Sequence, residues 1–245
     1  MTGTPAIIEL AGVEKTYRSI GGRRAGRGVG FRALRGVDLA IARGEMVAIT
    51  GPSGSGKTTI INLIAGVDRP TAGTVTVNGS RLDQMTEDQL AVWRGRTIGI
   101  VFQFFQLMPT LTATENATLP LDLARLGAAR ERKAVASRHL ATVGLGDRHD
   151  RLPLELSGGE QQRVAIARAM ACGPPILLGD EPTGNLDTKM AQDMFKLLKE
   201  LNDGGTTVVY VTHDQALAVL ASRVVSVRDG LIVGDTGRRR AGDTT

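Results

Sequence analysis

The chain carries a glycine-rich run, GPSGSGKT at positions 51–58, whose spacing matches the pattern G-x-x-x-x-G-K-[ST]. The short apolar run 46–49 precedes it and is typical of a buried strand, while 58–65 favours a helix that Gly66 ends. Glycines at this spacing let successive backbone N–H groups turn inward without side chains in the way. The run therefore constrains this part of the chain to a strand, a tight turn and a helix, in that order.

The same run predicts a site for the phosphates of a nucleotide. A helix that begins at about Lys57 adds the positive end of its dipole, and the Lys57 ammonium would reach the β- and γ-phosphates. The Thr58 hydroxyl would bind Mg²⁺. We therefore expect ATP and Mg²⁺ as ligands; a glycine-rich surface turn is the alternative. The expected nucleotide-binding residues in this run are Gly51, Pro52, Ser53, Gly54, Ser55, Gly56, Lys57, Thr58 and Thr59.

Strands and helices alternate along most of the chain, which predicts a largely parallel sheet covered on both faces. The segment Ile7–Tyr17 alternates as an edge strand does. Further strands are expected at 33–41, 75–77, 98–102, 176–178, 207–211 and 223–227, and later helices at 161–171 and 190–201. From Gln103 to Leu156 the pattern is helical instead, as in 114–126 and 130–143, which predicts a helical subdomain inserted at about 104–165.

Composition narrows the class of protein. No stretch of about 20 apolar residues and no signal peptide is visible, and the one cysteine, Cys172, has no partner for a disulfide, so we expect a cytosolic protein. The net charge of +5 permits a nucleic-acid binder. The arginines are concentrated in 18–35 and 238–240, however, and aromatic residues make up only 3%, so no nucleic acid is expected.

Two carboxylates and a histidine follow predicted strands. Asp180 and Glu181 come directly after the apolar run 176–178, where Asp180 would bind Mg²⁺ and Glu181 would polarise or orient an attacking water. His213 follows the strand 207–211 and would face the same crevice, contacting the γ-phosphate or holding Glu181 and the water. An acidic strand end in solvent and a structural histidine are the alternatives.

The run LSGGEQQR at 156–163 resembles the signature sequence of ABC-transporter ATPases. The order along the chain is also similar to that family: Tyr17, the glycine-rich run, Gln103, the signature, Asp180-Glu181, Asp187 and His213. The resemblance spans Ile7 to about Gly234 and implies that 1–245 is one ATP-binding domain. It implies an α/β P-loop NTPase fold with a RecA-like core, a mostly parallel sheet, an antiparallel β edge near the N-terminus and an inserted α-helical subdomain.

The resemblance also assigns roles to individual residues. Tyr17 would stack on adenine, and Gln103 would sense Mg²⁺ and the water and link to the membrane partner. The signature residues that act on another subunit are Ser157, Gly158, Gly159 and Glu160. Of these, Ser157 and Gly159 would bind the γ-phosphate of the ATP on that subunit, and a helix that begins there offers N–H donors for it. Asp187, in the segment 185–187, would lie at the dimer interface.

One glycine-rich run and one signature per chain imply a head-to-tail homodimer with two ATP molecules between the subunits. ATP would close the dimer, and hydrolysis would reopen it. The mechanical work would be done on an integral-membrane permease supplied by another chain. The protein would therefore be cytoplasmic and attached peripherally to the inner face of the cell membrane through that permease.

The segment Phe102–Asn116 resembles the group of these ATPases that releases lipoproteins or exports macrolides and peptides. That group most often has Asn where this chain has Gln106, and the Arg/Gly-rich loop 18–30 is longer than usual. The apolar run 104–111 is expected to serve both as core and as docking surface for a coupling helix of the permease.

Three other functions remain open at this stage. A cell-division ATPase that regulates an enzyme outside the membrane is close to the same group. An ABC ATPase acting on DNA or the ribosome usually carries coiled-coil or zinc inserts or a second cassette, and none is visible in this sequence. A nucleotide-binding module without turnover would not need Glu181.

Overall fold

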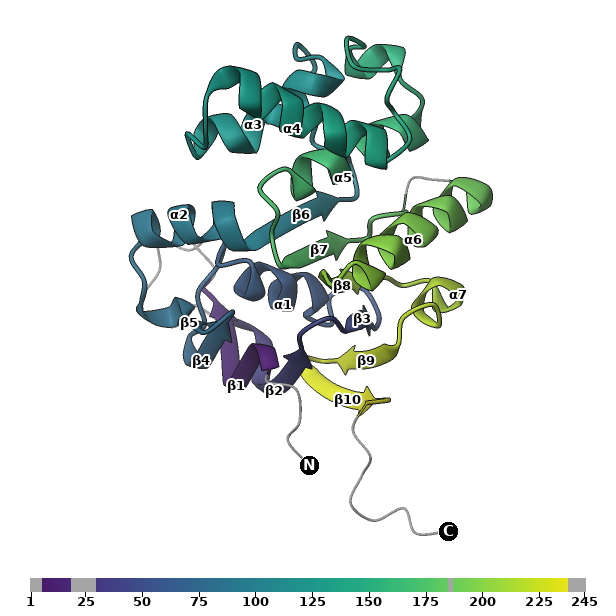
Figure 1. Ribbon diagram of the computed structural model, residues 1–245. Helices are drawn as coiled ribbons and strands as arrows, with labels where there is room; N and C mark the ends of the chain where they lie inside the picture. The colour runs from purple at the N-terminus through teal and green to yellow at the C-terminus, as the bar shows by residue number, and fades with distance from the viewer. Residues whose placement is uncertain (1–5, 19–29, 185–186, 238–245) are drawn as a thin grey trace, which may run out of the picture. The chain divides into compact units, whose positions relative to one another are not determined.

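The computed structural model describes residues 6–18, 30–184 and 187–237 (Figure 1). The expectations for the loop segment 19–29, for Asn185 and Leu186, and for the arginines 238–240 fall outside the described residues. The chain divides into two compact units. The first comprises the chain up to Arg43, 47–86 and the chain from Val211, and the second comprises 44–46 and 87–210.

The first unit contains a four-stranded antiparallel sheet in the order β2-β1-β4-β5 (Figure 1). The strands are β1 (Ala6–Tyr17), β2 (Phe31–Ala42), β4 (Ala72–Val77) and β5 (Ser80–Arg81). An antiparallel sheet near the N-terminus is therefore present as expected. The expectation that β1 is an edge strand is wrong, because β1 is hydrogen-bonded on both sides. Its alternation reflects one buried face of the sheet, not a free edge.

The rest of the first unit holds the glycine-rich run. Its elements are β3 (Met46–Thr50), α1 (Lys57–Ile64), the 3₁₀ turn η1 (Leu82–Gln84), α7 (Gln215–Ala218), β9 (Arg223–Arg228) and β10 (Leu231–Asp235). β3 pairs in parallel with β9, and β10 returns antiparallel to β9. Residues 46–49 of β3 are at most 2% exposed, as the continuous apolar run predicts.

The β9–β10 hairpin supports the glycine-rich run. Its turn residues Asp229 and Gly230 have φ angles of 51° and 78°, the left-handed conformation that two-residue hairpin turns require. The Gly230 N–H donates to the Ser55 carbonyl over 3.0 Å, and the Gly230 carbonyl accepts from the Arg35 N–H over 2.9 Å. The hairpin thus ties the run to β2.

The second unit places β7 (Ile176–Asp180) between β8 (Thr207–Val211) and β6 (Ile98–Phe102). β6 and β7 are parallel, with Phe102 opposite Asp180. The helical elements are α2 (Glu87–Thr97), α3 (Ala113–Leu123), α4 (Ala129–Thr142), the 3₁₀ turn η2 (Pro153–Glu155), α5 (Gly158–Met170) and α6 (Thr188–Asp203). All of α3, α4, η2 and α5 lie between β6 and β7 in the chain, and α3, α4 and α5 pack against one another (Figure 1).

One helix begins at a different residue from the one that the apolar pattern predicts, because a capping residue sets its N-terminus. α5 begins at Gly158, three residues before the apolar period suggests, because Ser157 caps its N-terminus. The sequence pattern does not reveal α2, in which Leu90 is the one buried apolar residue. Within the described ranges, no helix is both long enough and apolar enough to span a lipid bilayer.

An ion pair in the first unit closes the β9–β10 hairpin. Both Arg223 and Asp235 are largely buried, with side chains 11% and 6% exposed. The guanidinium makes two bonds of 2.8 Å to the carboxylate and donates from Nη1 to the Ala40 carbonyl over 2.9 Å. A bidentate pair of this kind is a strong interaction. Removal of one partner is strongly destabilising, because the other charge then stays buried without compensation.

We predict that Asp235→Ala lowers the free energy of unfolding by about 3 kcal/mol, because it leaves a buried guanidinium without its carboxylate. Asp203→Ala is the matched control, since Asp203 pairs with Lys199 on the surface, with side chains 62% and 55% exposed. It should cost less than about 1 kcal/mol. Urea unfolding of both variants measures the difference, and equal losses would contradict a special role for the buried pair.

Candidate functional site

The glycine-rich run of the first unit has a backbone conformation that could not form if certain of its glycines carried side chains. Gly51 has a φ of 148°, and a Cβ there would lie 2.0 Å from the Val227 carbonyl oxygen. Gly56, which precedes α1, has a φ of 107°, and its Cβ would lie 2.7 Å from the Ala33 carbonyl oxygen. Both positions therefore require glycine for conformation and for space. A turn of residues with positive φ that leads into a helix N-terminus is the kind of backbone from which anion-binding nests are built.

Lys57 is held at the loop that it follows. Its side chain reaches back so that Nζ donates to the carbonyls of Gly51 and Pro52 over 2.9 and 2.8 Å, and the residue is only 7% exposed. These bonds use two of the three donors of an ammonium group and fix its charge beside the turn. Thr58 is exposed, whereas Ser55 is 3% exposed and its Oγ has no hydrogen-bond partner among the described residues.

Tyr17 ends β1, and the residue is 39% exposed. Its hydroxyl donates to Asp68 Oδ2 over 2.7 Å, and Lys15 Nζ lies 4.8 Å from the ring centroid. Burial, and then the bond to Asp68, raise the pKa of Tyr17. Burial alone would raise the pKa of Asp68, but hydrogen bonds from Lys15 and Tyr17 lower it overall. The ring is thus an anchored aromatic surface that can accept a flat ligand.

His213 lies in the first unit, just past the end of β8. The preceding Thr212 donates its N–H to the Ile49 carbonyl over 3.2 Å. This segment therefore lies next to the end of β3, where the glycine-rich run begins. Asp214 caps α7 by accepting the Ala216 N–H over 2.8 Å. The His213 side chain is exposed. The first unit therefore brings the glycine-rich run and His213 to the same strand ends.

The acidic pair of the second unit lies at the end of β7. Asp180 is the last residue of the strand, and both carboxylates are half-buried. Glu181 has a φ of 48°, a left-handed conformation that is uncommon for a residue with a side chain. Such strain persists where surrounding structure imposes it, and it is enriched at functional sites. Gly179 is buried in the strand, where a Cβ would lie 3.1 Å from both Pro182 and Tyr210, so this strand packs more closely than a larger residue permits.

Gln103 comes directly after β6 and Glu181 directly after β7, and the last residues of these strands, Phe102 and Asp180, are paired in the parallel register. Its amide packs against Gly184, where a Cβ would lie 2.8 Å from Nε2. The second unit thus brings Gln103 and the two carboxylates together at one edge of its strands.

The loop after Gln103 has an unusual backbone. Phe105 and Gln106 have φ angles of 40° and 53°. Asn tolerates this conformation better than Gln does, which gives a physical reason for the Asn usual in the group that the segment resembles. The Arg168 guanidinium of α5 donates to the Phe105 carbonyl over 2.8 Å and also to the Gln106 carbonyl, and so supports both residues.

The signature run forms the N-terminus of α5. Ser157 is the N-cap, and Gly159 lies so close to α6 that a Cβ would be 2.8 Å from Met190 Sδ. Asp187 caps α6 by accepting the Met190 N–H over 2.9 Å. Gly158 has the Phe105 ring as its neighbour, 3.8 Å from where a Cβ would stand. The structure thus brings the signature, Asp187 and the loop after Gln103 together.

Gln162 is a residue of the site that the sequence reasoning missed. It is fully buried, and its Nε2 donates to the Pro182 carbonyl, directly after Glu181. It therefore joins α5 to the turn that carries the acidic pair. A polar residue on the apolar face of the predicted helix was the signal that could have indicated it, because buried amides need partners.

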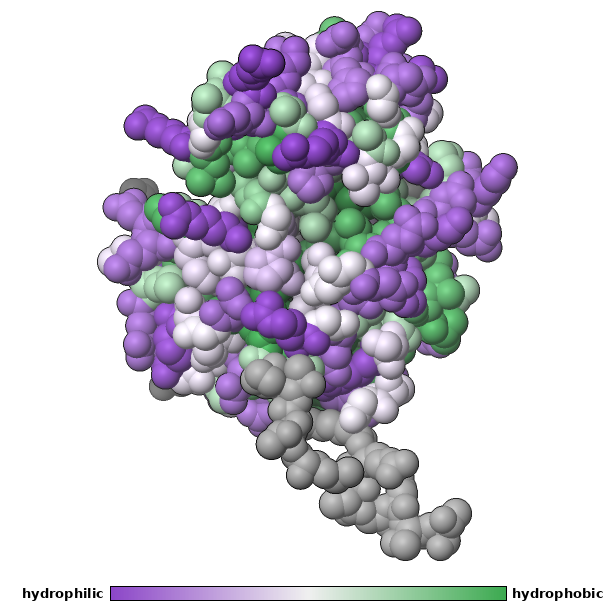
Figure 2. Space-filling view, viewed as in Figure 1, coloured by the Kyte–Doolittle hydropathy of each residue, from purple (hydrophilic) through white to green (hydrophobic). Residues whose placement is uncertain are grey.

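An apolar groove of about 750 Å³ lies in the second unit between α2, β6 and α3. Figure 2 shows apolar residues gathered on the side of α3 toward α2. Val92 and Leu123, 60% and 78% exposed, line it, as does the half-buried Cys172, whose pKa burial raises. Four arginines also line the groove: Arg94, Arg96, Arg125 and Arg168.

The model of the ABC transporter family matches residues 34–184, a range that holds the glycine-rich run, the signature and the acidic pair. The chain is 48% identical over 236 residues to the lipoprotein-releasing system ATP-binding protein LolD of Anaeromyxobacter dehalogenans, and the match covers 96% of each chain. It is 43% identical to the macrolide export ATP-binding/permease protein MacB of Hyphomonas neptunium, over 97% of this chain and 36% of that protein.

Solved structures agree with these similarities. The ATP-binding cassette MJ0796, described as a dimer in a post-hydrolysis state bound to ADP and Pi, is 42% identical with a TM-score of 0.83, covering 93% of this chain and 97% of that one. A second dimeric structure of MJ0796 is 43% identical with a TM-score of 0.82, covering the same shares. The expected P-loop NTPase fold is thereby confirmed.

We predict that Gly51→Ala lowers the free energy of unfolding by at least about 3 kcal/mol, because its Cβ would overlap the Val227 carbonyl of β9. Gly54→Ala is the control, since Gly54 also has a positive φ, 76°, but nothing lies within 4 Å of its Cβ. It should cost only about 1–2 kcal/mol of backbone strain. Thermal and urea unfolding compare the two variants, and similar losses would show that space at Gly51 is unimportant.

Proposed function

This chain belongs to the ABC transporter family and is one of its ATP-binding, ATP-hydrolysing components, and from that premise we propose how its residues divide the work. The glycine-rich run binds the phosphates of ATP through its backbone N–H groups, and Lys57 contacts the β- and γ-phosphates. The fixed position of Lys57 Nζ supports this role. Tyr17 stacks its exposed ring on the adenine.

The hydrolytic role falls to residues at strand ends. Glu181 polarises and orients the attacking water, and His213 contacts the γ-phosphate. Glu181 is supported in this role by its left-handed backbone and by the buried Gln162 behind its turn. Gln103, packed on Gly184, senses the water.

Mg²⁺ fits the donors that the chain offers. It prefers hard oxygen ligands and usually takes only one or two from the protein, completing its shell with phosphate and water. The half-buried carboxylate of Asp180 and the exposed hydroxyl of Thr58 are donors of this kind, and Gln103 adds an amide oxygen. When bound, the ion would neutralise charge on the β- and γ-phosphates.

The working form is a homodimer with two ATP molecules at its interface. Ser157, Gly158, Gly159 and Glu160 begin a helix whose N-terminus suits a γ-phosphate, and this chain supplies one such end and one glycine-rich run. A head-to-tail pair satisfies both, with Asp187 at the interface. The dimers described for MJ0796 support this arrangement.

The apolar groove of the second unit receives an amphipathic cytoplasmic helix of an integral-membrane permease. The exposed Val92 and Leu123 suit its apolar face, and the arginines that line the groove favour acidic residues at its edge. The helical segment 104–165 is the subdomain that contributes α3 and the signature. Arg168 lines the groove and supports the loop that follows Gln103. This loop connects the groove to the acidic pair.

The permease is a separate chain, and the protein is attached through it to the inner face of the cell membrane. The names of LolD and MacB support a release or export function, with a lipoprotein or a macrolide as cargo. The single observation that carries the ATPase assignment is the strained, half-buried Glu181 at the end of β7.

We predict that Glu181→Gln reduces ATP turnover by about a hundredfold or more, because an amide cannot accept a proton from water. ATP should still bind, and the variant should form a dimer in ATP that light scattering detects. Lys57→Ala is the contrasting variant, since it should weaken ATP binding by at least about tenfold and give no such dimer. Near-normal turnover of Glu181→Gln would refute the role of Glu181.

We predict that an amphipathic helical peptide with one leucine face and flanking glutamates slows alkylation of Cys172. That residue lines the groove and is the one cysteine in the chain. The same peptide with lysines in place of glutamates should protect less, because arginines line the groove. Leu123→Arg should abolish the protection, whereas Val233→Arg on β10, 53% exposed in the other unit, should not. Equal protection by both peptides would contradict the charge preference.

A further inference from the structure

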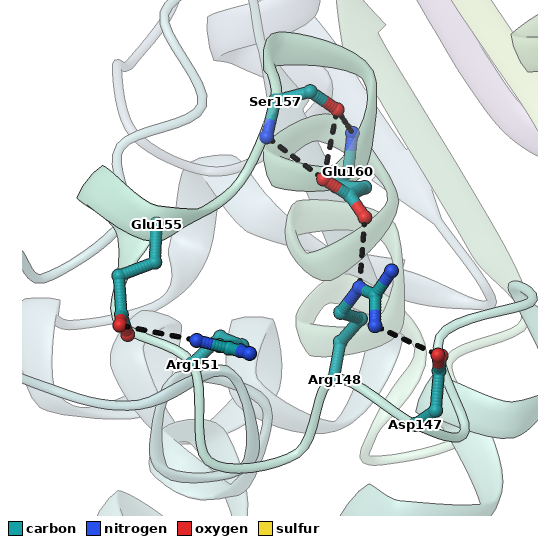
Figure 3. A network of polar contacts seen from close by, with 6 residues as sticks. All are labelled: Asp147, Arg148, Arg151, Glu155, Ser157 and Glu160. Atoms are coloured by element: carbon teal, nitrogen blue, oxygen red, sulfur yellow. Dashed lines mark hydrogen bonds and ion pairs between the residues drawn. The ribbon is translucent and has the colours of Figure 1, made fainter.

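The hydroxyl of the signature serine, Ser157, is hydrogen-bonded within its own helix, α5. The Ser157 hydroxyl donates to Glu160 Oε2 over 2.9 Å, and Ser157 Oγ accepts the Glu160 N–H over 3.3 Å (Figure 3). The Ser157 N–H also donates to Glu160 Oε2, over 2.8 Å. This reciprocal arrangement is a capping box, which satisfies the first donors of α5. A hydroxyl has one proton, so Ser157 must withdraw it from Glu160 before it can donate to a phosphate oxygen.

Glu160 also places a negative charge where an anion must arrive. Backbone and hydroxyl donors of Ser157, followed by Arg148, lower the pKa of Glu160, so this carboxylate is ionised near neutral pH. A carboxylate in the first turn stabilises a helix. The same charge repels a γ-phosphate that approaches the N-terminus of α5.

Arg148 holds the far side of this carboxylate. Its Nε donates to Glu160 Oε1 over 3.1 Å, and its Nη1 donates to Asp147 Oδ2 over 2.7 Å (Figure 3). The two oxygens of Glu160 are thus divided, with Oε2 toward Ser157 and Oε1 toward Arg148. The guanidinium offsets the charge of Glu160 and keeps the carboxylate in place when the Ser157 hydroxyl turns away.

The Arg148 side chain is not needed to keep its own loop in place. The backbone of this segment is fixed by other bonds: the Arg151 and His149 carbonyls accept from Ala113 and Thr114 over 2.8 and 3.0 Å, and the Arg148 N–H donates to Leu145 over 3.1 Å. The side chain itself is 41% exposed. Its removal should therefore leave the fold intact.

We propose that Arg148 is a positioning residue for ATP hydrolysis, which acts through Glu160 to release the Ser157 hydroxyl to the γ-phosphate. The inference rests on the proposed role of the signature in the ATP-bound dimer. Arg148 lies outside the signature, and by this proposal it affects the affinity of that dimer for ATP.

The test measures steady-state ATP hydrolysis by the full chain over a range of ATP concentrations. Arg148→Gln should raise the KM for ATP by about two- to fivefold, the range for an exposed ion pair, with a smaller change in kcat. In the Glu160→Gln background, where no charge needs offsetting and the capping box can persist, Arg148→Gln should change KM by less than about twofold. The affinity for ADP, which needs only the glycine-rich run, should be unchanged.

Arg151→Gln is the matched control (Figure 3). Arg151 pairs with Glu155 over 3.4 Å, and Glu155 accepts the Leu152 N–H three residues before it over 2.7 Å. The geometry repeats that of Arg148 and Glu160 at η2, and Figure 3 shows no bond from Arg151 or Glu155 to Ser157. Its KM should equal that of the wild type.

An unchanged KM for Arg148→Gln, or an equal increase in the Glu160→Gln background, would overturn the proposal. A lower melting temperature of Arg148→Gln that accompanies its KM increase would also overturn it, because the side chain would then support the fold. Failure of the proposed function gives a different result: Ser157→Arg, which blocks the γ-phosphate site, would then hydrolyse ATP at the wild-type rate.

Discussion

The buried helix α5 is the constraint on which the second unit depends. Its Gln162 holds the turn after Glu181, its Arg168 holds the left-handed Phe105 and Gln106, and its N-cap Ser157 is the signature serine. Apolar side chains between these positions pack into the core and fix the rotation of the helix. One rigid helix therefore fixes the positions of polar groups in three different loops relative to one another.

The first unit depends on close backbone contacts instead. Gly51 and Gly56 bring the loop against the carbonyls of Val227 and Ala33, and Gly230 bonds to Ser55. Contacts of this kind leave no room for adjustment, so the shape of the loop is determined before a ligand arrives. Lys57, held by two carbonyls of the same loop, extends this preorganisation to a charge.

Much of the fold and most of the candidate site could be predicted because their signals are local. Apolar runs marked β3, β6, β8 and β9, and motif spacing identified the glycine-rich run and the signature. What could not be predicted depends on contacts between distant residues. β1 alternates like an edge strand but has neighbours on both sides, and α2 buries too little apolar surface to show a period. Gln162 and Arg148 act through partners 20 and 12 residues away, which no pattern along the chain indicates.

The contact between the β9–β10 hairpin and the glycine-rich run has a consequence for biosynthesis. A run near residue 51 is closed by a strand and a turn near residues 227 and 230, so the loop cannot take its final shape on a nascent chain until β9 and the hairpin turn have left the ribosome. Pairing across so many residues is slow to form. The glycine-rich run thus stays without its closing contacts for as long as the ribosome is translating the residues between it and β9.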